Sequence, residues 1–336
     1  MSCRIEMAIV GVMTWPVTWD DVLDAKRRIA EHLTPTPSRR YAELDEAVGH
    51  GIEVWVKHEN HQPTQAFKVR NGIAALTSLS DEAKGKGVIA ATRGNHGQGV
   101  AWAGRALGID VTICVPHGNN PEKNSAMRAQ GATVIESGDD YDASVDVAKG
   151  LVAERGLTLI HSTNDPQVIA GATTITTELL AQAPPLDAMV VSVGGGSQAV
   201  GALTAARQLA EGMQVYGVQA ERASAIHDGF HAGEPVSKDS ADTFADGLAT
   251  RSCYALTFPA LCEGLADFVT VSESEIAEAI RLLLRTTHNL AEGAGAAGLA
   301  GLLELAPRLE GKRVGIILSG GNIDAATLQR VLAGEL

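Results

Sequence analysis

The feature that most constrains the fold is a repeated alternation of short apolar runs with longer, helix-like segments between residues 87 and 219. Short apolar runs bounded by turn residues are typical of buried strands, and apolar residues spaced by three or four are typical of helices. Their alternation predicts parallel strands joined by crossover helices. We expect strands at residues 87–91, 110–115, 132–135, 187–193 and 214–219, and helices at 97–107, from 120 onward, and at 140–154, 165–180 and 198–209.

The flanking regions extend this pattern. Thr18 and Asp21 form a capping-box-like start for a helix that runs to about Leu33. Residues 222–264, with scattered Gly, Pro and Ser, are predicted to be irregular and to form the rim of an active site. We also expect a helix that carries Lys68, strands at 52–57, 268–271 and 313–318, and helices at 272–288 and 292–305.

The chain has 336 residues, which is long enough for two sub-domains with cores of their own. The predicted fold class is therefore α/β, with two open sheet domains whose parallel strands are flanked by helices.

Composition argues against several classes of partner. The formal net charge is −13, from 27 Lys and Arg against 40 Asp and Glu, and basic residues form no strong cluster. Nucleic acids and anionic membranes are therefore poor partners. No apolar run approaches the length of a membrane span, and the N-terminal stretch lacks an export signal. Met7 and Met13 are alternative start residues. The four cysteines are not spaced as metal ligands or as a C-x-x-C motif, and their small number indicates reduced thiols in a cytoplasmic protein. They are Cys3, Cys114, Cys253 and Cys262.

The stretch around Lys68 places a lysine at the start of an apolar helix. Two interpretations are open. Lys68 is a surface lysine that extends its charged end to water, as most lysines do. Alternatively, burial lowers its pKa, so that the neutral amine can form a Schiff base with a carbonyl compound. The stretch alone does not separate the two.

A glycine run follows the strand at 187–193 and precedes a helix, in the string Gly194-Gly195-Gly196-Ser197. Exposed backbone N–H groups at the start of a helix bind anions such as phosphate. The run also fits a plain tight turn, or a dinucleotide fingerprint through Gly194-x-Gly196-x-x-Ala199 with Glu221 as the acid on the ribose. A fingerprint of this kind is weak on its own, and it does not account for Lys68.

Two further loops follow strands. The string Gly94-Asn95-His96-Gly97 offers backbone N–H groups and an amide, which suit a carboxylate ligand. The string Ser319-Gly320-Gly321-Asn322 places a hydroxyl at the carboxyl end of the last strand, where ligands of open α/β sheets bind. A helix cap and an ordinary turn are the simpler explanations of each string taken alone.

Together these strings resemble the fold-type II pyridoxal-phosphate enzymes, in the serine/threonine dehydratase and serine racemase group, over about residues 18–330. Phe67-Lys68-Val69-Arg70 is similar to the family's F-K-x-R, and residues 94–98 to its G-N-H-x-Q loop. Residues 194–197 resemble its tetraglycine phosphate cup, and residues 318–322 its L-S-G-G-N string. Residues 161–171 resemble a further family string, H-x-x-x-D-P-x-x-x-A-G.

The resemblance implies a role for each matching residue, with pyridoxal 5′-phosphate as the cofactor. Lys68 is the Schiff-base lysine, Asn95 bonds the phenolic oxygen of the cofactor, and Ser319 faces its pyridine nitrogen. The implied cofactor contacts are Phe67, Lys68, Asn95, Gly194, Gly195, Gly196, Ser197, Glu292 and Ser319, and the implied neighbours of the substrate carboxylate are Thr92, Gly94 and His96. It also implies a large cofactor-binding domain of residues 1–60 and 160–336 and a small substrate-side domain of residues 61–159.

The chain departs from the family pattern at several positions. Ala66 and Ser197 replace a serine and a glycine, and Arg93 stands where the racemases place a serine that acts as the second acid/base. A guanidinium does not deprotonate near neutral pH, so Arg93 either grips a polar group of the substrate or points to solvent. Residues 246–251 resemble a family substrate-side string, A-D-G-x-A, and Arg251 in it is a second candidate anion contact. Gln219 stands where relatives place a metal-binding acid, with Glu221 nearby, so we assign no metal site.

The resemblance implies an ammonia-lyase (dehydratase) that converts a β-hydroxy α-amino acid, such as threonine, serine, 3-hydroxyaspartate or phenylserine, to a 2-oxo acid and ammonia. Alternatives are a β-replacement enzyme or a racemase of the same fold, a non-catalytic binding paralogue, and an NAD-binding oxidoreductase. The only predicted partner is the small-molecule substrate, with no nucleic acid and no membrane, and we expect a homodimer or homotetramer. Because the chain ends soon after Asn322, feedback through a C-terminal regulatory domain is not expected.

Overall fold

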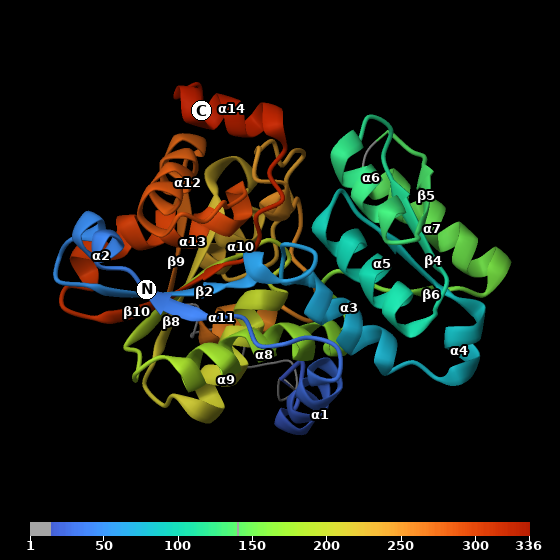
Figure 1. The fold of residues 1–336 in the computed structure, drawn as a ribbon, viewed down its shortest axis with the longest axis horizontal. Coiled ribbons are helices and arrows are strands. Elements are labelled where there is room, and N and C mark those ends of the chain that lie inside the picture. The colour runs from blue at the N-terminus through green and yellow to red at the C-terminus, as the bar shows by residue number, and fades with distance from the viewer. Residues whose placement is uncertain (1–14, 140) are drawn as a thin grey trace.

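The computed structural model describes residues 15–139 and 141–336, and these residues form two sheets (Figure 1). The larger sheet has the strand order β1-β2-β10-β7-β8-β9, and only the pair β1 and β2 is antiparallel among its described pairs. Its strands are β1 (Ser38–Arg40), β2 (Glu53–His58), β7 (Ala188–Ser192), β8 (Gln214–Ala220), β9 (Asp267–Val271) and β10 (Arg313–Leu318). The predicted α/β class is confirmed.

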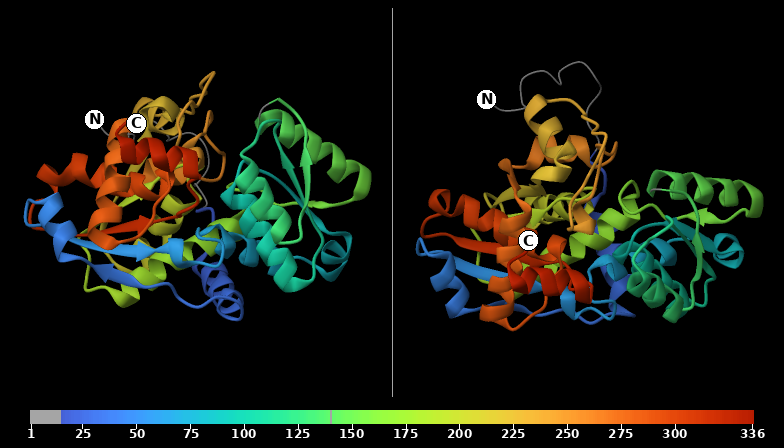
Figure 2. Two further views of the ribbon diagram at one scale, coloured as in Figure 1. Left: turned by 45° about the horizontal axis from the view of Figure 1, so that its top comes forward. Right: turned by 90° about the horizontal axis from the view of Figure 1, so that it is seen from above.

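The smaller sheet has the order β5-β4-β3-β6, and all of its pairs are parallel. Its strands are β3 (Val88–Ala91), β4 (Val111–Val115), β5 (Thr133–Glu136) and β6 (Thr158–Leu159). Its helices are α4 (Asp81–Lys86), α5 (Asn95–Leu107), α6 (Pro121–Ala129) and α7 (Tyr141–Arg155). This unit lies beside the unit of the larger sheet, and the two are seen side by side in Figure 1 and Figure 2.

Helices cover both faces of the larger sheet, as the side chains of β7 illustrate. Met189 and Val191 belong to the core that includes α1, α8 and α9, whereas Ala188 and Val190 belong to the core that includes α12 and α13. Because successive side chains of a strand point to opposite faces, a strand buried on both faces reads as one apolar run. The helices of this unit are α1 (Trp19–Ala30), α2 (Ala42–Val48), α8 (Pro166–Gln182), α9 (Ser197–Leu209), α10 (Ala225–Ala232), α11 (Phe258–Gly264), α12 (Glu273–Thr287), α13 (Gly293–Leu305) and α14 (Ala325–Ala333).

Helix α3 (Lys68–Thr77) packs between α5 of the smaller unit and α8 of the larger one. Glycines allow this close packing. A Cβ at Gly72 of α3 would lie 2.5 Å from the carbonyl oxygen of Gly99 in α5, and a Cβ at Gly171 of α8 would lie 2.8 Å from that of Arg70. Both distances are too short for a methyl group, so the backbones touch directly and the position of Lys68 is fixed by both units.

A buried cluster of charged side chains joins α3 to β2, to the residue that follows β2 and to α8. The guanidinium of Arg70 contacts the carboxylate of Glu59 at 2.7 Å and that of Glu178 at 2.6 Å, and Nζ of Lys57 contacts Glu178 at 2.7 Å. Arg70, Glu59 and Lys57 are almost fully excluded from solvent. A buried pair of this kind is costly to break, because its remaining charge has no partner.

Most of the predicted elements are present, but the prediction for residues 222–264 is wrong in part. That segment contains α10, the 3-10 helix η3 (Asp246–Leu248) and α11 rather than irregular backbone throughout. The sequence prediction also missed β1, β6, α2, α4 and α14. The alternative starts Met7 and Met13 lie outside the described residues, as does Cys3, and Cys114 and Cys253 are free thiols. Among the described residues, no helix is both long enough and apolar enough to cross a membrane.

Candidate active site

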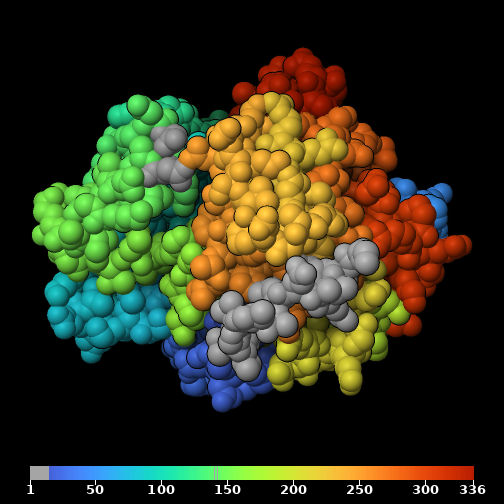
Figure 3. Space-filling view, turned by 180° about the vertical axis from the view of Figure 1, so that it is seen from behind, coloured from blue at the N-terminus to red at the C-terminus, as the bar shows by residue number. Residues whose placement is uncertain are grey.

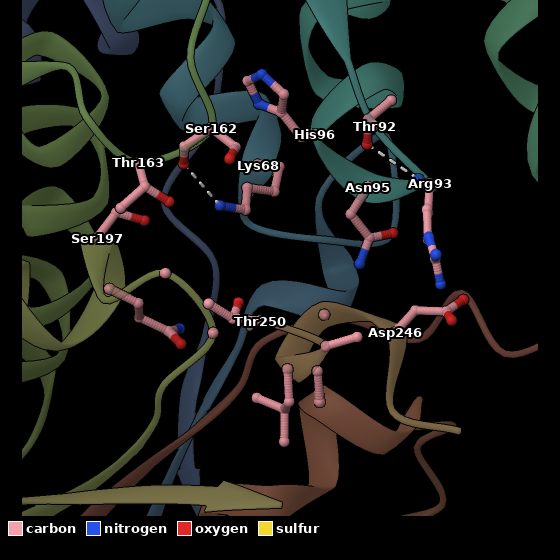
Figure 4. A pocket seen from close by; sticks show the side chains of 18 of the residues that line it. Lys68, Thr92, Arg93, Asn95, His96, Ser162, Thr163, Ser197, Asp246 and Thr250 are labelled. Atoms are coloured by element: carbon pink, nitrogen blue, oxygen red, sulfur yellow. Dashed lines mark hydrogen bonds between the residues drawn. The ribbon is translucent and has the colours of Figure 1, made fainter. Parts of the chain in front are cut away.

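A cavity of about 150 Å³ lies where the smaller-sheet and larger-sheet units meet (Figure 4). It is bounded by the carboxyl ends of β3, β7 and β10, the edge at which open parallel sheets bind ligands. The structure brings together here all the site residues predicted from the sequence except Arg251: Phe67, Lys68, Thr92, Arg93, Gly94, Asn95, His96, Gly194, Gly195, Gly196, Ser197, Glu292 and Ser319.

Lys68 is the first residue of α3, and its side chain points into the cavity (Figure 4). Its Nζ donates to the carbonyl oxygen of Ser162 at 3.2 Å and lies 4.8 Å from the centre of the Phe67 ring. No carboxylate among the described residues forms an ion pair with it. Burial lowers the pKa of Lys68 to about 8, because the charged ammonium loses its water without gaining a counter-charge. A neutral amine is the form that attacks a carbonyl or removes a proton.

The loop after β3 lies on the side of the cavity formed by the smaller unit. The hydroxyl of Thr92 accepts from the N–H of Gly94 at 3.0 Å, and Nε2 of His96 lies 2.9 Å from the carbonyl of Ile160, to which it must donate. Burial, followed by the nearby charge of Lys68, lowers the pKa of His96 to about 3, so this ring is neutral at physiological pH. Its Nδ1 is buried without a hydrogen-bond partner among the described residues.

An amide-to-acid chain closes another side of the cavity. The amide of Asn322 donates to Oδ1 of Asn95 at 2.8 Å, and the amide of Asn95 donates to Oε1 of Glu292 at 2.5 Å. Burial raises the pKa of the Glu292 carboxyl, although Lys123 and Asn95 oppose the shift. Gly320 has to be glycine, because a Cβ there would overlap Oε1 of Glu292. The hydroxyl of Ser319 donates to the carbonyl of Ala294 at 3.3 Å.

The glycine loop joins β7 to the start of α9. Gly196 has φ of 100°, a left-handed conformation that favours glycine, and a Cβ at Gly195 would overlap the hydroxyl of Thr163. The N–H groups of Gly194, Gly195 and Gly196 donate to no other part of the described chain. Together with the N-terminus of a 13-residue helix, they form a site suited to a phosphate.

Several residues of the cavity were missed in the sequence analysis: Lys123, Tyr141, Ser162, Thr163 and Tyr254. Asp246 and Thr250, which also line the cavity, belong to the predicted substrate-side string of residues 246–251. Nζ of Lys123, on α6, pairs with the carboxylate of Asp246, on η3, so the pair links the two units. One signal could have found Lys123, since it lies in the first turn of the helix after β4, near the carboxyl edge of the smaller sheet. Asp246 belongs to the substrate-side string, but it is far away in the sequence, so no local signal links it to Lys123.

Arg251 lies outside this cavity and lines a second one, of about 310 Å³, beside it. The second cavity lies between Tyr141 of the smaller unit and the segment after β8, whose yellow-to-orange surface lies next to the green unit in Figure 3. Arg93 and Tyr254 line both cavities.

The two residues considered for a metal lie elsewhere. Gln219 is buried, and its Oε1 accepts from the backbone N–H of His227 at 3.1 Å, while Glu221 is exposed in the 3-10 helix η2 (Glu221–Ala223). The described residues contain no group of three or more His, Cys, Asp or Glu that could hold a metal ion.

Comparison with known proteins agrees with this geometry. Residues 29–320 match the family described as pyridoxal-phosphate dependent enzymes. The chain is 35% identical to L-threo-3-hydroxyaspartate ammonia-lyase of Saccharomyces cerevisiae over 95% of this chain and 97% of that one, and 35% identical to L-threonine ammonia-lyase of Thermotoga maritima over 94% and 78%. Among solved structures, maize serine racemase is 29% identical, with a TM-score of 0.90 over 96% of this chain and 98% of that one.

The fold and the cavity thus define an α/β enzyme of pyridoxal-phosphate fold type II. The chain belongs to the family of pyridoxal-phosphate dependent enzymes, and its cofactor is pyridoxal 5′-phosphate. The family resemblance inferred from the sequence is confirmed. The alternative interpretation of the glycine loop as an NAD-binding fingerprint is not supported by these comparisons.

The residues of the cavity fit this cofactor. An amine without a counter-charge is available for the aldehyde, and three unpaired backbone N–H groups at a helix start are available for the phosphate. Nε2 of Gln198, directly after Ser197 in the cavity wall, is also buried without a partner among the described residues. A ligand that supplies acceptors would satisfy these donors.

Proposed function

We propose that this protein is a pyridoxal-phosphate-dependent ammonia-lyase that removes water from a β-hydroxy α-amino acid and yields a 2-oxo acid and ammonia. The relatives support the proposal, because two are named ammonia-lyases of L-threo-3-hydroxyaspartate and of L-threonine. The observation that carries it is that one cavity contains both an amine without a counter-charge, on Lys68, and an uncharged hydroxyl, on Ser319.

We assign the cofactor contacts as follows. Lys68 would hold the aldehyde end, the N–H groups of residues 194–196 with Ser197 the phosphate, Asn95 the phenolic oxygen and Ser319 the pyridine nitrogen, with Phe67 and Glu292 beside the ring. When bound, the cofactor takes up the electron density left at Cα of the substrate. Because Ser319 is a neutral hydroxyl, it supplies no acidic proton to the ring nitrogen, which favours prompt loss of the β-substituent.

The residues of the chain account for the proton movements. The α-carboxylate would lie against the loop of residues 92–96, where the hydroxyl of Thr92 and the backbone N–H groups of Asn95 and His96 are the donors, with the neutral ring of His96 behind them. Nζ of Lys68, in its neutral form, takes the proton from Cα. The net change is the loss of the Cα proton and the β-hydroxyl as one water, and the released enamine then takes up one water to give the 2-oxo acid and ammonia.

Racemisation is the second candidate, since the solved neighbours include serine racemases. A racemase needs a second acid/base on the opposite face of the substrate, and Arg93 stands at the position of the racemase serine. A guanidinium is a poor acid/base near neutral pH, so an arginine at this position is unsuited to exchange a proton with Cα. Elimination is therefore the better supported reaction, and β-replacement would require a second substrate.

Three aspects of organisation belong to the same proposal. Residues 1–60 and 160–336 form the cofactor-binding domain and residues 61–159 the substrate-side domain, in keeping with the two sheets. The free thiols of Cys114 and Cys253 favour a reducing, cytoplasmic location. We expect a homodimer or homotetramer, which light scattering of the purified protein would measure.

The proposed function is tested by supplying the holoenzyme with a panel of β-hydroxy α-amino acids of both configurations. We expect equal amounts of 2-oxo acid and ammonia from at least one of them, and no turnover by the Lys68→Ala protein. Chiral chromatography separates racemisation, and an added thiol or sulfide reveals β-replacement. Release of neither product across the panel, with cofactor bound, would overturn the proposal.

A further inference from the structure

Arg93 lies at the junction of the two cavities described above. It lines the cavity of Lys68 and also the neighbouring cavity of about 310 Å³, together with Tyr141, Thr250 and Tyr254. In Figure 4 its side chain runs from the loop toward the side of the cavity where Asp246 lies, apart from the amine of Lys68. A substrate held near Lys68 could therefore extend a side chain toward Arg93 and the second cavity.

The guanidinium of Arg93 ends an exposed side chain that lies near Tyr141. No hydrogen bond or ion pair joins it to any residue in the described ranges, although it carries five N–H donors in a fixed fork. Two of the described acids that line these cavities form ion pairs with other residues. Asp246 pairs with Lys123, and Asp242 pairs with Arg222.

A free guanidinium at this position is suited to a carboxylate. The planar fork of arginine matches the two oxygens of a carboxylate in a bidentate pair, which is stronger than a hydrogen bond between neutral groups. The α-carboxylate of the substrate already has its own proposed site at the loop of residues 92–96, with the hydroxyl of Thr92 and the backbone N–H groups of Asn95 and His96 as donors. The group that reaches Arg93 must therefore be carried on the β-carbon.

We propose that Arg93 binds an anionic group on the β-carbon of the substrate, so that the enzyme prefers a β-hydroxy α-amino dicarboxylic acid, of which 3-hydroxyaspartate is the simplest. The inference rests on the proposed function and deepens it. The methyl group of threonine or the hydrogen of serine would leave the guanidinium without a partner. The neutralising pair of Lys123 and Asp246 keeps the nearby acid from competing for Arg93.

The test uses two substrates that differ by one charge, L-threo-3-hydroxyaspartate and its carboxamide, L-threo-3-hydroxyasparagine, with L-threonine as a third. Wild-type holoenzyme, Arg93→Gln and Arg93→Lys are compared. The matched control is Arg105→Gln, which removes an exposed arginine at the far end of α5. The reading is kcat/KM for each substrate, with the visible absorption of the bound cofactor confirming equal loading.

We expect the wild type to prefer the dicarboxylate to its amide. Arg93→Gln should lower kcat/KM for the dicarboxylate about 10- to 100-fold, the range of one charge-assisted pair, and change it little for the other two substrates. Arg93→Lys should lie between, because it keeps the charge and loses the fork. Arg105→Gln should leave all three values unchanged.

Two outcomes would overturn the inference while leaving the proposed function intact. One is turnover of threonine with no preference between the acid and the amide. The other is an equal loss on all three substrates in Arg93→Gln, which would show that Arg93 acts on the protein or the α-carboxylate. Absence of ammonia from every substrate would instead contradict the proposed function itself.

Discussion

The lowered pKa of Lys68 makes a quantitative prediction about the protein from which the cofactor has been removed. At pH 7, a pKa of about 8 leaves about 9% of the amine neutral, whereas the ordinary value of 10.5 would leave about 0.03%. The structure therefore predicts a reactive fraction at neutral pH about 300 times that of an ordinary lysine. Raising the pH increases this fraction steeply up to about pH 8 and little beyond pH 9.

Competitive labelling measures this fraction. The apoprotein is exposed to a small acylating reagent at a series of pH values, digested, and the extent of modification of Lys68 is read by mass spectrometry. Exposed Lys86 in the same digest corrects for changes in the reagent. We expect the Lys68 curve to have its midpoint near pH 8. A curve that still rises steeply above pH 10 would refute the argument that burial without a counter-charge depresses this pKa.

Two further predictions concern the surroundings of the amine. Gly195→Ala should lower the affinity for pyridoxal 5′-phosphate, because the new methyl group would overlap the hydroxyl of Thr163. Combining it with Thr163→Ala should recover part of the affinity. Dialysis followed by fluorescence titration measures both affinities, and an unchanged affinity in the single variant would contradict the packing of the loop. Arg70→Met should lower the free energy of unfolding by about 3–5 kcal/mol in urea titrations, because Glu59 remains buried without its main partner. Adding Glu59→Gln should restore part of that loss, and a stable single variant would contradict the anchoring role of the cluster.

The elements predicted from the sequence are those whose signals are local. Strands such as β7 are buried on both faces and read as continuous apolar runs, and the chemical strings follow such strands directly. The loops at residues 92–96 and 194–197 therefore came together as expected, since the carboxyl ends of parallel strands in each sheet share an edge and the two sheet units face each other across the cavity.

The parts that were not predicted depend on contacts between distant segments. β1 has only three residues, two of them exposed arginines, and exists because it pairs with β2. The pair of Lys123 and Asp246 joins residues of two different units. Helix α10 contains histidines and glycine in a segment rich in turn residues, and it is held by packing against β8, β9 and α11. No pattern within a short stretch of the sequence predicts such contacts.

The central claim is that Lys68 holds pyridoxal 5′-phosphate, and borohydride reduction of the holoenzyme tests it most directly. Reduction fixes the cofactor to the amine that carries it, and peptide mapping then identifies that residue. We predict loss of the visible absorption on reduction, one cofactor-derived mass per chain on the peptide containing Lys68, and no such mass in Lys68→Ala. A protein that binds no cofactor, or a label found on another lysine, would contradict the account.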